Sequence, residues 1–248
     1  SPLSVEKFKG NLAVLVAALC MLLLSLTVSG VRNVSATPES STYDIYEESE
    51  RLVALTFDDG PKEGKTDALL DMLKEKGVHA TFFMIGAQVE ENQEIVRRMY
   101  EEGHQIGIHT YSHVDLGCLS EAEQKKEIEK SETAIEAVTG QSGFMLRPPF
   151  GRINKNLEDW LDCPMILWSV DTEDWTGKSA AEIIRETAET VKDGDIILMH
   201  DISEHGLEGA AGIIDELQRM GYTFLTVEQL FACRDIEPED GVAYRRAR

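Results

Sequence analysis

Two adjacent carboxylates, Asp58 and Asp59, end a short apolar run and stand directly before Gly60 and Pro61. Asp, Gly and Pro collect in turns, so these residues taken alone are explained as well by a turn as by chemistry. The choice between the two readings depends on whether other reactive side chains occupy equivalent positions elsewhere in the chain.

Two histidines, His109 and His113, follow another apolar run and are separated by four positions. Side chains with this spacing share one face of a helix, so the pair can hold one cation if the segment is helical. A single HxxxH pair is weak evidence, but an aspartate from the strand end at 58–59 would supply a third ligand. Two imidazoles and one carboxylate leave a fourth position for water, as in catalytic zinc sites, and this water becomes a usable nucleophile.

The remaining ionisable groups could supply the general base and the general acid that a hydrolase requires. One aspartate of the adjacent pair can bind the metal while the other accepts a proton from water. Arg147, in the segment RPPFG, is the cation available to keep that base ionised. His200, at the end of a further apolar run, can protonate a leaving group if a carboxylate such as Asp174 sustains its charged form. These residues together predict hydrolysis of an acyl group from an amide or an ester.

An alternation of apolar runs and amphipathic stretches must position these side chains. The runs 52–57, 80–85, 104–110, 165–170, 195–200 and 222–227 are predicted strands, and 64–77, 92–103, 120–140, 179–194 and 207–221 are predicted helices. Ser120 and Glu123 form a predicted capping box at the start of the third helix. Six or seven βα units in about 190 residues predict an α/β fold with a mainly parallel sheet, closed as a barrel more than left open. Functional groups of a barrel lie at the C-terminal ends of its strands.

The charge balance excludes one class of partner. The chain has 24 Lys and Arg against 45 Asp and Glu, a formal net charge of −21. Nucleic acid requires a basic surface, so no nucleic-acid partner is expected, and electrostatic attraction to anionic lipid is not expected either.

The four cysteines do not form a CxxC pair, so a thiolate zinc site is not expected. Cys20 lies in an apolar segment near the N-terminus. The sequence leaves the disulfide state of Cys118, Cys163 and Cys233 open.

The N-terminal segment predicts export of the rest of the chain. Residues 11–28 carry no charge and follow Lys7 and Lys9, which favours a membrane-spanning helix with its N-terminus in the cytoplasm. The segment VSA, ending at Ala36, resembles a signal cleavage site, so the product is either anchored, which we favour, or secreted. The expected organisation is an n-region at 1–10, an anchor or signal at 11–29, a linker at 30–50, a catalytic domain at 51–233 and a tail at 234–248.

Five motifs in order give the chain a family resemblance: TFDDG, HTYSH, RPPFG, DTEDW and LMH. Over residues 50–233 the sequence resembles the polysaccharide deacetylases of carbohydrate esterase family 4. The resemblance implies a distorted (β/α) barrel, often of seven strands, and removal of N-acetyl groups from amino sugars.

The resemblance also implies a role for each motif residue. Asp58 would be the general base, held by Arg147, and His200 the general acid, tuned by Asp174. The metal, most often zinc and sometimes cobalt, would be held by Asp59, His109 and His113. The backbone N–H of Phe150 would stabilise the oxyanion, and Trp175 and Leu198 would line the acetyl pocket.

Three positions depart from the family pattern without removing a ligand or a proton carrier. Phe150 replaces a common Tyr, Ile108 a common Asn, and Val114 a common Pro. An active, metal-dependent, extracytoplasmic enzyme is therefore expected, with cell-wall peptidoglycan (N-acetylglucosamine or N-acetylmuramic acid) or a chitin-like oligomer as substrate. The alternatives are an O-acetyl esterase acting on xylan or another glycan, and a glycan-binding module without catalysis.

Overall fold

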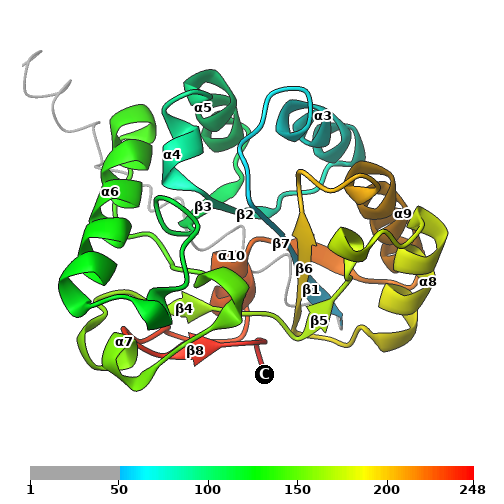
Figure 1. The fold of residues 1–248 in the computed structure, drawn as a ribbon. Helices are drawn as coiled ribbons and strands as arrows, with labels where there is room; N and C mark the ends of the chain where they lie inside the picture. The colour runs from blue at the N-terminus through cyan, green and yellow to red at the C-terminus, as the bar shows by residue number, and fades with distance from the viewer. Residues whose placement is uncertain (1–50) are drawn as a thin grey trace, which may run out of the picture. The chain divides into compact units, whose positions relative to one another are not determined.

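The computed structural model describes residues 51–248, in which a mainly parallel sheet forms the centre. The strand order is β3-β2-β1-β6-β5, and β7 pairs with the first half of β1 (Figure 1). All of these pairings are parallel. The strands are β1 (Leu52–Asp58), β2 (Thr81–Met84), β3 (Gln105–Ile108), β4 (Met165–Ile166), β5 (Val170–Asp171), β6 (Asp195–His200), β7 (Thr223–Leu225) and β8 (Ala243–Tyr244).

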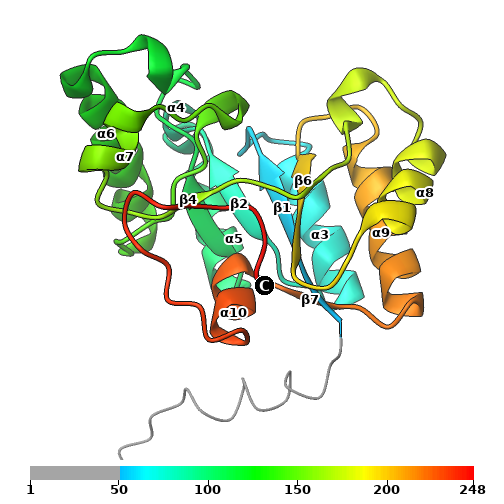
Figure 2. The ribbon, with the colours of Figure 1, turned by 90° about the horizontal axis from the view of Figure 1, so that it is seen from below.

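Helices surround this sheet, as the two ribbon views show (Figures 1 and 2). The α-helices are α3 (Thr66–Lys76), α4 (Gly86–Val89), α5 (Gln93–Glu101), α6 (Glu121–Thr139), α7 (Lys155–Trp160), α8 (Ala180–Thr190), α9 (Gly206–Arg219) and α10 (Val227–Ala232). Three short 3-10 helices complete the described elements: η1 (Leu116–Cys118), η2 (Pro149–Gly151) and η3 (Asp174–Thr176).

The extended segment 165–171 connects the two edges of the sheet. At its start, the N–H of Ile166 donates to the carbonyl of Leu146, and Leu146 also forms a parallel bridge with Ile108 at the end of β3. Further along, the N–H of Ser169 donates to the carbonyl of Ile196 in β6. The sheet therefore curves back on itself, in agreement with the barrel class that the alternation predicts.

Strand β1 is buried along its whole length because helices and other strands cover both of its faces. An uninterrupted apolar strand of this kind is typical of a central strand in a parallel sheet. Its C-terminal end projects Asp58, and in the register of the sheet His200 of β6 lies opposite Asp58. The base and acid candidates are thus adjacent in space although far apart in the chain.

The predicted elements are confirmed to within a few residues, and further short elements are present. The capping box of Ser120 and Glu123 is present, as predicted. The predicted strand 165–170 is divided into β4 and β5, which pair with different partners. The predicted strand 222–227 ends early because Thr226 caps a helix. Helices α4, α7 and α10 and strand β8 were not predicted.

None of the helices described between residues 51 and 248 is long and apolar enough to cross a membrane. The predicted anchor at 11–29 and linker at 30–50 lie outside the described residues. Cys118 and Cys163 are free thiols, and burial raises the pKa of Cys163 to about 12, so this thiol is unreactive.

Candidate active site

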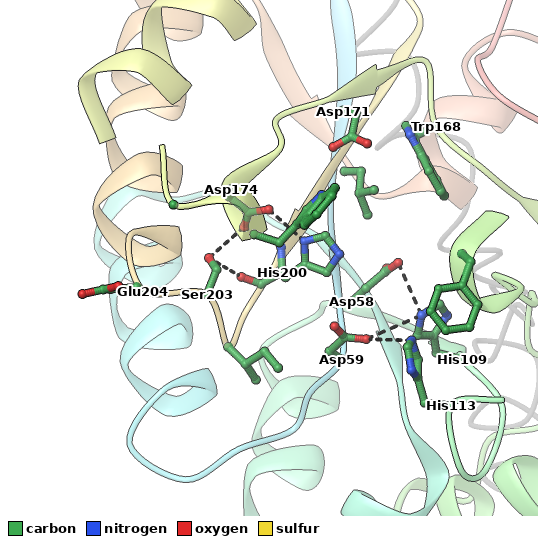
Figure 3. A pocket seen from close by; sticks show the side chains of 15 residues that line it. Asp58, Asp59, His109, His113, Trp168, Asp171, Asp174, His200, Ser203 and Glu204 are labelled. Carbon is green, nitrogen blue, oxygen red and sulfur yellow. Dashed lines mark hydrogen bonds and ion pairs between the residues drawn. The ribbon is translucent and has the colours of Figure 1, made fainter. Parts of the chain in front are cut away.

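The ends of β1, β3, β5 and β6 and the loops after them surround one pocket of about 700 Å³. It lies where parallel strands run out, as the sequence predicts. Figure 3 shows Asp58 and Asp59 between the two histidines His109 and His113 on one side and His200 on the other. Of the ten residues predicted for the site, nine line this pocket: Asp58, Asp59, His109, His113, Phe150, Asp174, Trp175, Leu198 and His200.

Asp59, His109 and His113 form a group able to hold a metal ion. Each offers one ligand atom, and these atoms lie within 4.8 Å of one another. Asp59 Oδ1 is 3.6 Å from Nε2 of His109 and 3.4 Å from Nε2 of His113. This oxygen is buried and has no hydrogen-bond partner among the described residues, as expected for an atom that binds a cation. The predicted triad therefore fits a divalent metal.

A turn, not a helix, brings the two histidines together. The conditional helical reading of the HxxxH spacing is wrong, since residues 109–113 contain no helix and Thr110 and His113 have positive φ angles of 61° and 54°. The left-handed residues fold the chain back, and the rings of His109 and His113 lie 5.0 Å apart. The two histidines can therefore still bind one cation together, although a turn and not a helix brings them close.

The ring of His109 is held in one orientation by the backbone. Its Nδ1 lies 2.6 Å from the carbonyl oxygen of Arg147, so Nδ1 carries the proton and Nε2 faces Asp59. Burial lowers the pKa of His109, against the opposing charges of Asp58 and Asp59, which favours the neutral ring that a metal requires.

Arg147 is fully buried and anchors Asp58. Its Nη1 donates to Oδ1 of Asp58 at 2.8 Å and to Oγ1 of Thr56 at 2.7 Å. Its other nitrogens donate to the carbonyls of Ile166 and Leu167. Burial lowers the pKa of Arg147 and Asp58 counteracts this, so the guanidinium remains charged. The ion pair keeps Asp58 in one orientation, with Oδ2 3.7 Å from Nε2 of His109.

His200 and Asp174 form the second ion pair of the pocket. Nδ1 of His200 donates to Oδ1 of Asp174 at 2.8 Å, and the backbone N–H of His200 donates to Oδ2 at 2.8 Å. Burial opposes protonation of His200, but the hydrogen bond and charge of Asp174, aided by Asp58 and Asp59, raise its pKa to about 9. The imidazole can thus hold a proton at neutral pH.

The other predicted residues form the walls. Leu198 is buried, whereas Phe150 and Trp175 are 58% and 64% exposed. Phe150 has a positive φ of 62°, and its ring lies edge-on to His113, with 5.0 Å between centroids. Large aromatic faces open to solvent beside a pocket are suited to stacking on sugar rings.

Sequence reasoning missed several residues of the site. Trp168 and Ser203 line the pocket, and Oγ of Ser203 donates to Oδ2 of Asp174 at 2.8 Å. No spacing pattern marks Ser203, because its contact with Asp174 spans 29 positions. The DTEDW motif contains Asp171, which also lines the pocket.

Comparisons with known proteins agree with this geometry. Residues 46–162 match the family model of polysaccharide deacetylases. The chain is 39% identical over 181 residues to the peptidoglycan-N-acetylglucosamine deacetylase PgdA of Listeria monocytogenes, covering 73% of this chain and 39% of that protein. It is 38% identical over 197 residues to the peptidoglycan-N-acetylmuramic acid deacetylase PdaC of Bacillus subtilis, covering 79% and 42%. The chain thus spans about two fifths of the length of these two curated relatives.

The comparison with one solved structure covers nearly all of the solved chain. The family 4 acetyl xylan esterase of Clostridium thermocellum, in complex with a cobalt ion, is 31% identical with a TM-score of 0.76. The alignment covers 79% of this chain and 98% of that one. Sequence, fold and pocket geometry therefore agree: the chain belongs to the polysaccharide deacetylase family, a family of hydrolases.

Proposed function

We propose that this protein is a metal-dependent N-deacetylase that removes acetyl groups from amino-sugar residues of peptidoglycan. The observation that carries the proposal is the presence of two ion pairs, Asp58–Arg147 and Asp174–His200, on either side of one candidate metal site. A base, a cation site and an acid around one pocket are what hydrolysis of an amide requires.

The candidate ligands are Asp59, His109 and His113. A divalent cation held there, with zinc the first choice and cobalt the second, supplies Lewis acidity and lowers the pKa of water. Asp58 takes the proton from the attacking water, since the hydrogen bond from Arg147 to Oδ1 orients the carboxylate. The division of labour between the two adjacent aspartates follows from their partners: Asp58 is paired with a cation and Asp59 is not.

His200 donates its proton to the nitrogen of the leaving amine. The hydrogen bond to Asp174 keeps the imidazole charged, and Ser203 holds the far oxygen of Asp174. The backbone N–H of Phe150 is the proposed donor to the oxyanion, a contribution of about 3 kcal/mol in comparable sites. Leu198 and Trp175 enclose the acetyl methyl group.

The cell wall is the proposed place of action. PgdA and PdaC are described as deacetylases of peptidoglycan, on N-acetylglucosamine and N-acetylmuramic acid respectively. The uncharged segment at 11–28 supports export of the rest of the chain. The proposed organisation is a single-pass anchor at 11–29, a linker at 30–50 and a catalytic domain at 51–233. The catalytic domain would be a barrel of about seven strands, as in the family. We expect the polysaccharide substrate and, through an uncleaved N-terminal helix, the membrane as partners, and no nucleic acid.

A second candidate function is hydrolysis of O-acetyl esters on xylan, because the Clostridium thermocellum relative is described as an acetyl xylan esterase. The two are separated by measuring acetate release from peptidoglycan, chitooligosaccharides and acetylated xylan by the zinc-loaded protein. The proposal predicts release from the amino-sugar polymers at a rate well above that from xylan. Release from xylan alone would assign the protein to the ester-hydrolysing group.

Asp174→Asn is expected to move the alkaline limb of the kcat/KM profile to lower pH. His200 must be protonated to act as an acid, so activity falls as pH rises through its pKa of about 9. Removing the charge of Asp174 leaves burial to dominate and lowers that pKa by about one unit or more. A pH profile of acetate release for both proteins measures the shift. An unchanged alkaline limb would remove His200 from the role of acid.

Asp59→Asn is expected to weaken zinc binding by about a hundredfold, since it replaces an anionic ligand atom that has no other partner. Competition with a chromophoric chelator measures the affinity. High zinc concentration should restore part of the activity if the loss is one of metal binding. Zinc affinity equal to that of the wild type would show that Asp59 is not a ligand.

A further inference from the structure

The turn that carries Asp58 and Asp59 has an unusual backbone. Asp59 has a φ angle of 78°, in the left-handed region that residues other than glycine seldom adopt. Such a conformation persists only where the surrounding structure imposes it. The contacts around the turn therefore determine where the carboxylate of Asp59 points.

Three separate elements hold the turn. From the end of β2, the N–H of Ile85 donates to the carbonyl of Gly60 at 2.9 Å. From the start of α3, Oγ1 of Thr66 accepts from the N–H of Lys62 at 2.8 Å. From the end of β6, the N–H of Asp201 donates to the carbonyl of Asp58 at 3.3 Å.

Thr66 and Asp201 are joined to each other beneath the turn. Oγ1 of Thr66 donates to Oδ2 of Asp201 at 2.5 Å, and both residues are buried, at 0% and 6% exposure. The carboxylate of Asp201 packs directly on Gly60, where a Cβ atom would lie 1.9 Å from Oδ2. The close approach explains why glycine follows the two aspartates.

The buried position of the Asp201 carboxyl group beneath the turn lowers the stability of the fold. Asp201 lies near Asp58 and Asp59, and its Oδ1 has no hydrogen-bond partner among the described residues. Burial, reinforced by the two neighbouring carboxylates, raises the pKa of Asp201 to about 7. Buried polar groups with this profile concentrate at functional sites.

We propose that Asp201 and Thr66 are positioning residues, which fix the Asp58–Lys62 turn so that Asp59 presents its oxygen to the metal. Because Asp201 directly follows His200, the pair also ties the turn of the base to the strand end of the acid. The inference rests on the proposed function, since it assigns these residues a role in the same site.

Thr66→Val tests the proposal, because it removes the hydroxyl and nearly preserves the shape of the side chain. We expect zinc affinity, measured by chelator competition, to fall about tenfold, and kcat for acetate release to fall about tenfold with little change in KM. Thr66→Ser retains the hydroxyl and should restore both values. Thr187→Val is the matched control, since it removes another buried hydroxyl, one without a hydrogen-bond partner in the described chain.

Gly60→Ala provides a second, independent variant. Its new methyl group must displace Asp201, so the same losses of zinc affinity and kcat are expected. The proposal is overturned if Thr66→Val and Gly60→Ala bind zinc and turn over as Thr66→Ser does, whatever their melting temperatures. A wild-type protein that binds zinc but releases no acetate would instead contradict the proposed function, while the zinc affinities of the variants would still decide this inference.

Discussion

Asp58→Asn is expected to lower kcat about a thousandfold while zinc affinity stays within a few-fold of the wild-type value. The amide has nearly the shape of the carboxylate and can still accept from Nη1 of Arg147, but it cannot take a proton from water. Acetate release under saturating substrate and zinc competition with a chelator measure the two quantities separately.

Asp159→Asn is the control for this experiment, because Asp159 is an exposed aspartate in α7 that does not line the pocket. It should leave both quantities unchanged. Near-normal turnover by Asp58→Asn would contradict the assignment of the base, and loss of zinc would mean that Asp58 and Asp59 share the metal.

Arg147→Met is expected to lower the free energy of unfolding by about 3–5 kcal/mol and to abolish activity. The substitution leaves the 4% exposed side chain of Asp58 as an uncompensated buried charge, which is the most costly way to break a buried ion pair. It also removes the donors to the carbonyls of Ile166 and Leu167, in the segment that connects the two edges of the sheet. Urea unfolding, monitored by circular dichroism, measures the change.

A double variant separates charge from packing in this prediction. Arg147→Met combined with Asp58→Asn should recover a large part of the lost stability, because no buried charge remains unpaired. Arg152→Met is the surface control: the side chain of Arg152 is 68% exposed and pairs with Asp115, so its loss should change stability by less than about 1 kcal/mol. Equal effects of Arg147→Met and Arg152→Met would contradict the account of Arg147 as a buried anchor.

The sequence was informative where regular structure positions the side chains. Asp58 and His200 end apolar runs that become adjacent parallel strands, and strands in a parallel sheet end at the same edge. Their proximity could therefore be predicted from the pattern of runs. The ordered motifs added the assignment of roles, which periodicity alone does not provide.

The sequence was less informative where irregular backbone positions the side chains. Asp59, Thr110, His113 and Phe150 all have positive φ angles that tertiary contacts impose, and such conformations are uncommon for any residue other than glycine. The helical geometry considered for His109 and His113 was wrong for this reason. The contacts of Ser203 and Asp201 were missed because their partners lie far away in the chain.

Some of the missed structure did have a local signal. Thr226 and Gln229 form a capping box at the start of α10, the same signature that correctly predicted the start of α6. The apolar residues before Thr226 favour a longer strand, which is why the predicted strand 222–227 includes the capping residue. The capping box at Thr226 is therefore the local feature that separates β7 from α10.

The most direct test of the account is to count acetate against new free amines during digestion of peptidoglycan by the zinc-loaded protein, before and after chelation. The account predicts one new amine for each acetate released, loss of both with the chelator, and recovery of both when zinc is returned. Acetate released without new amines would show that the bond cleaved is an ester, and release that survives verified removal of metal would contradict the role assigned to Asp59, His109 and His113.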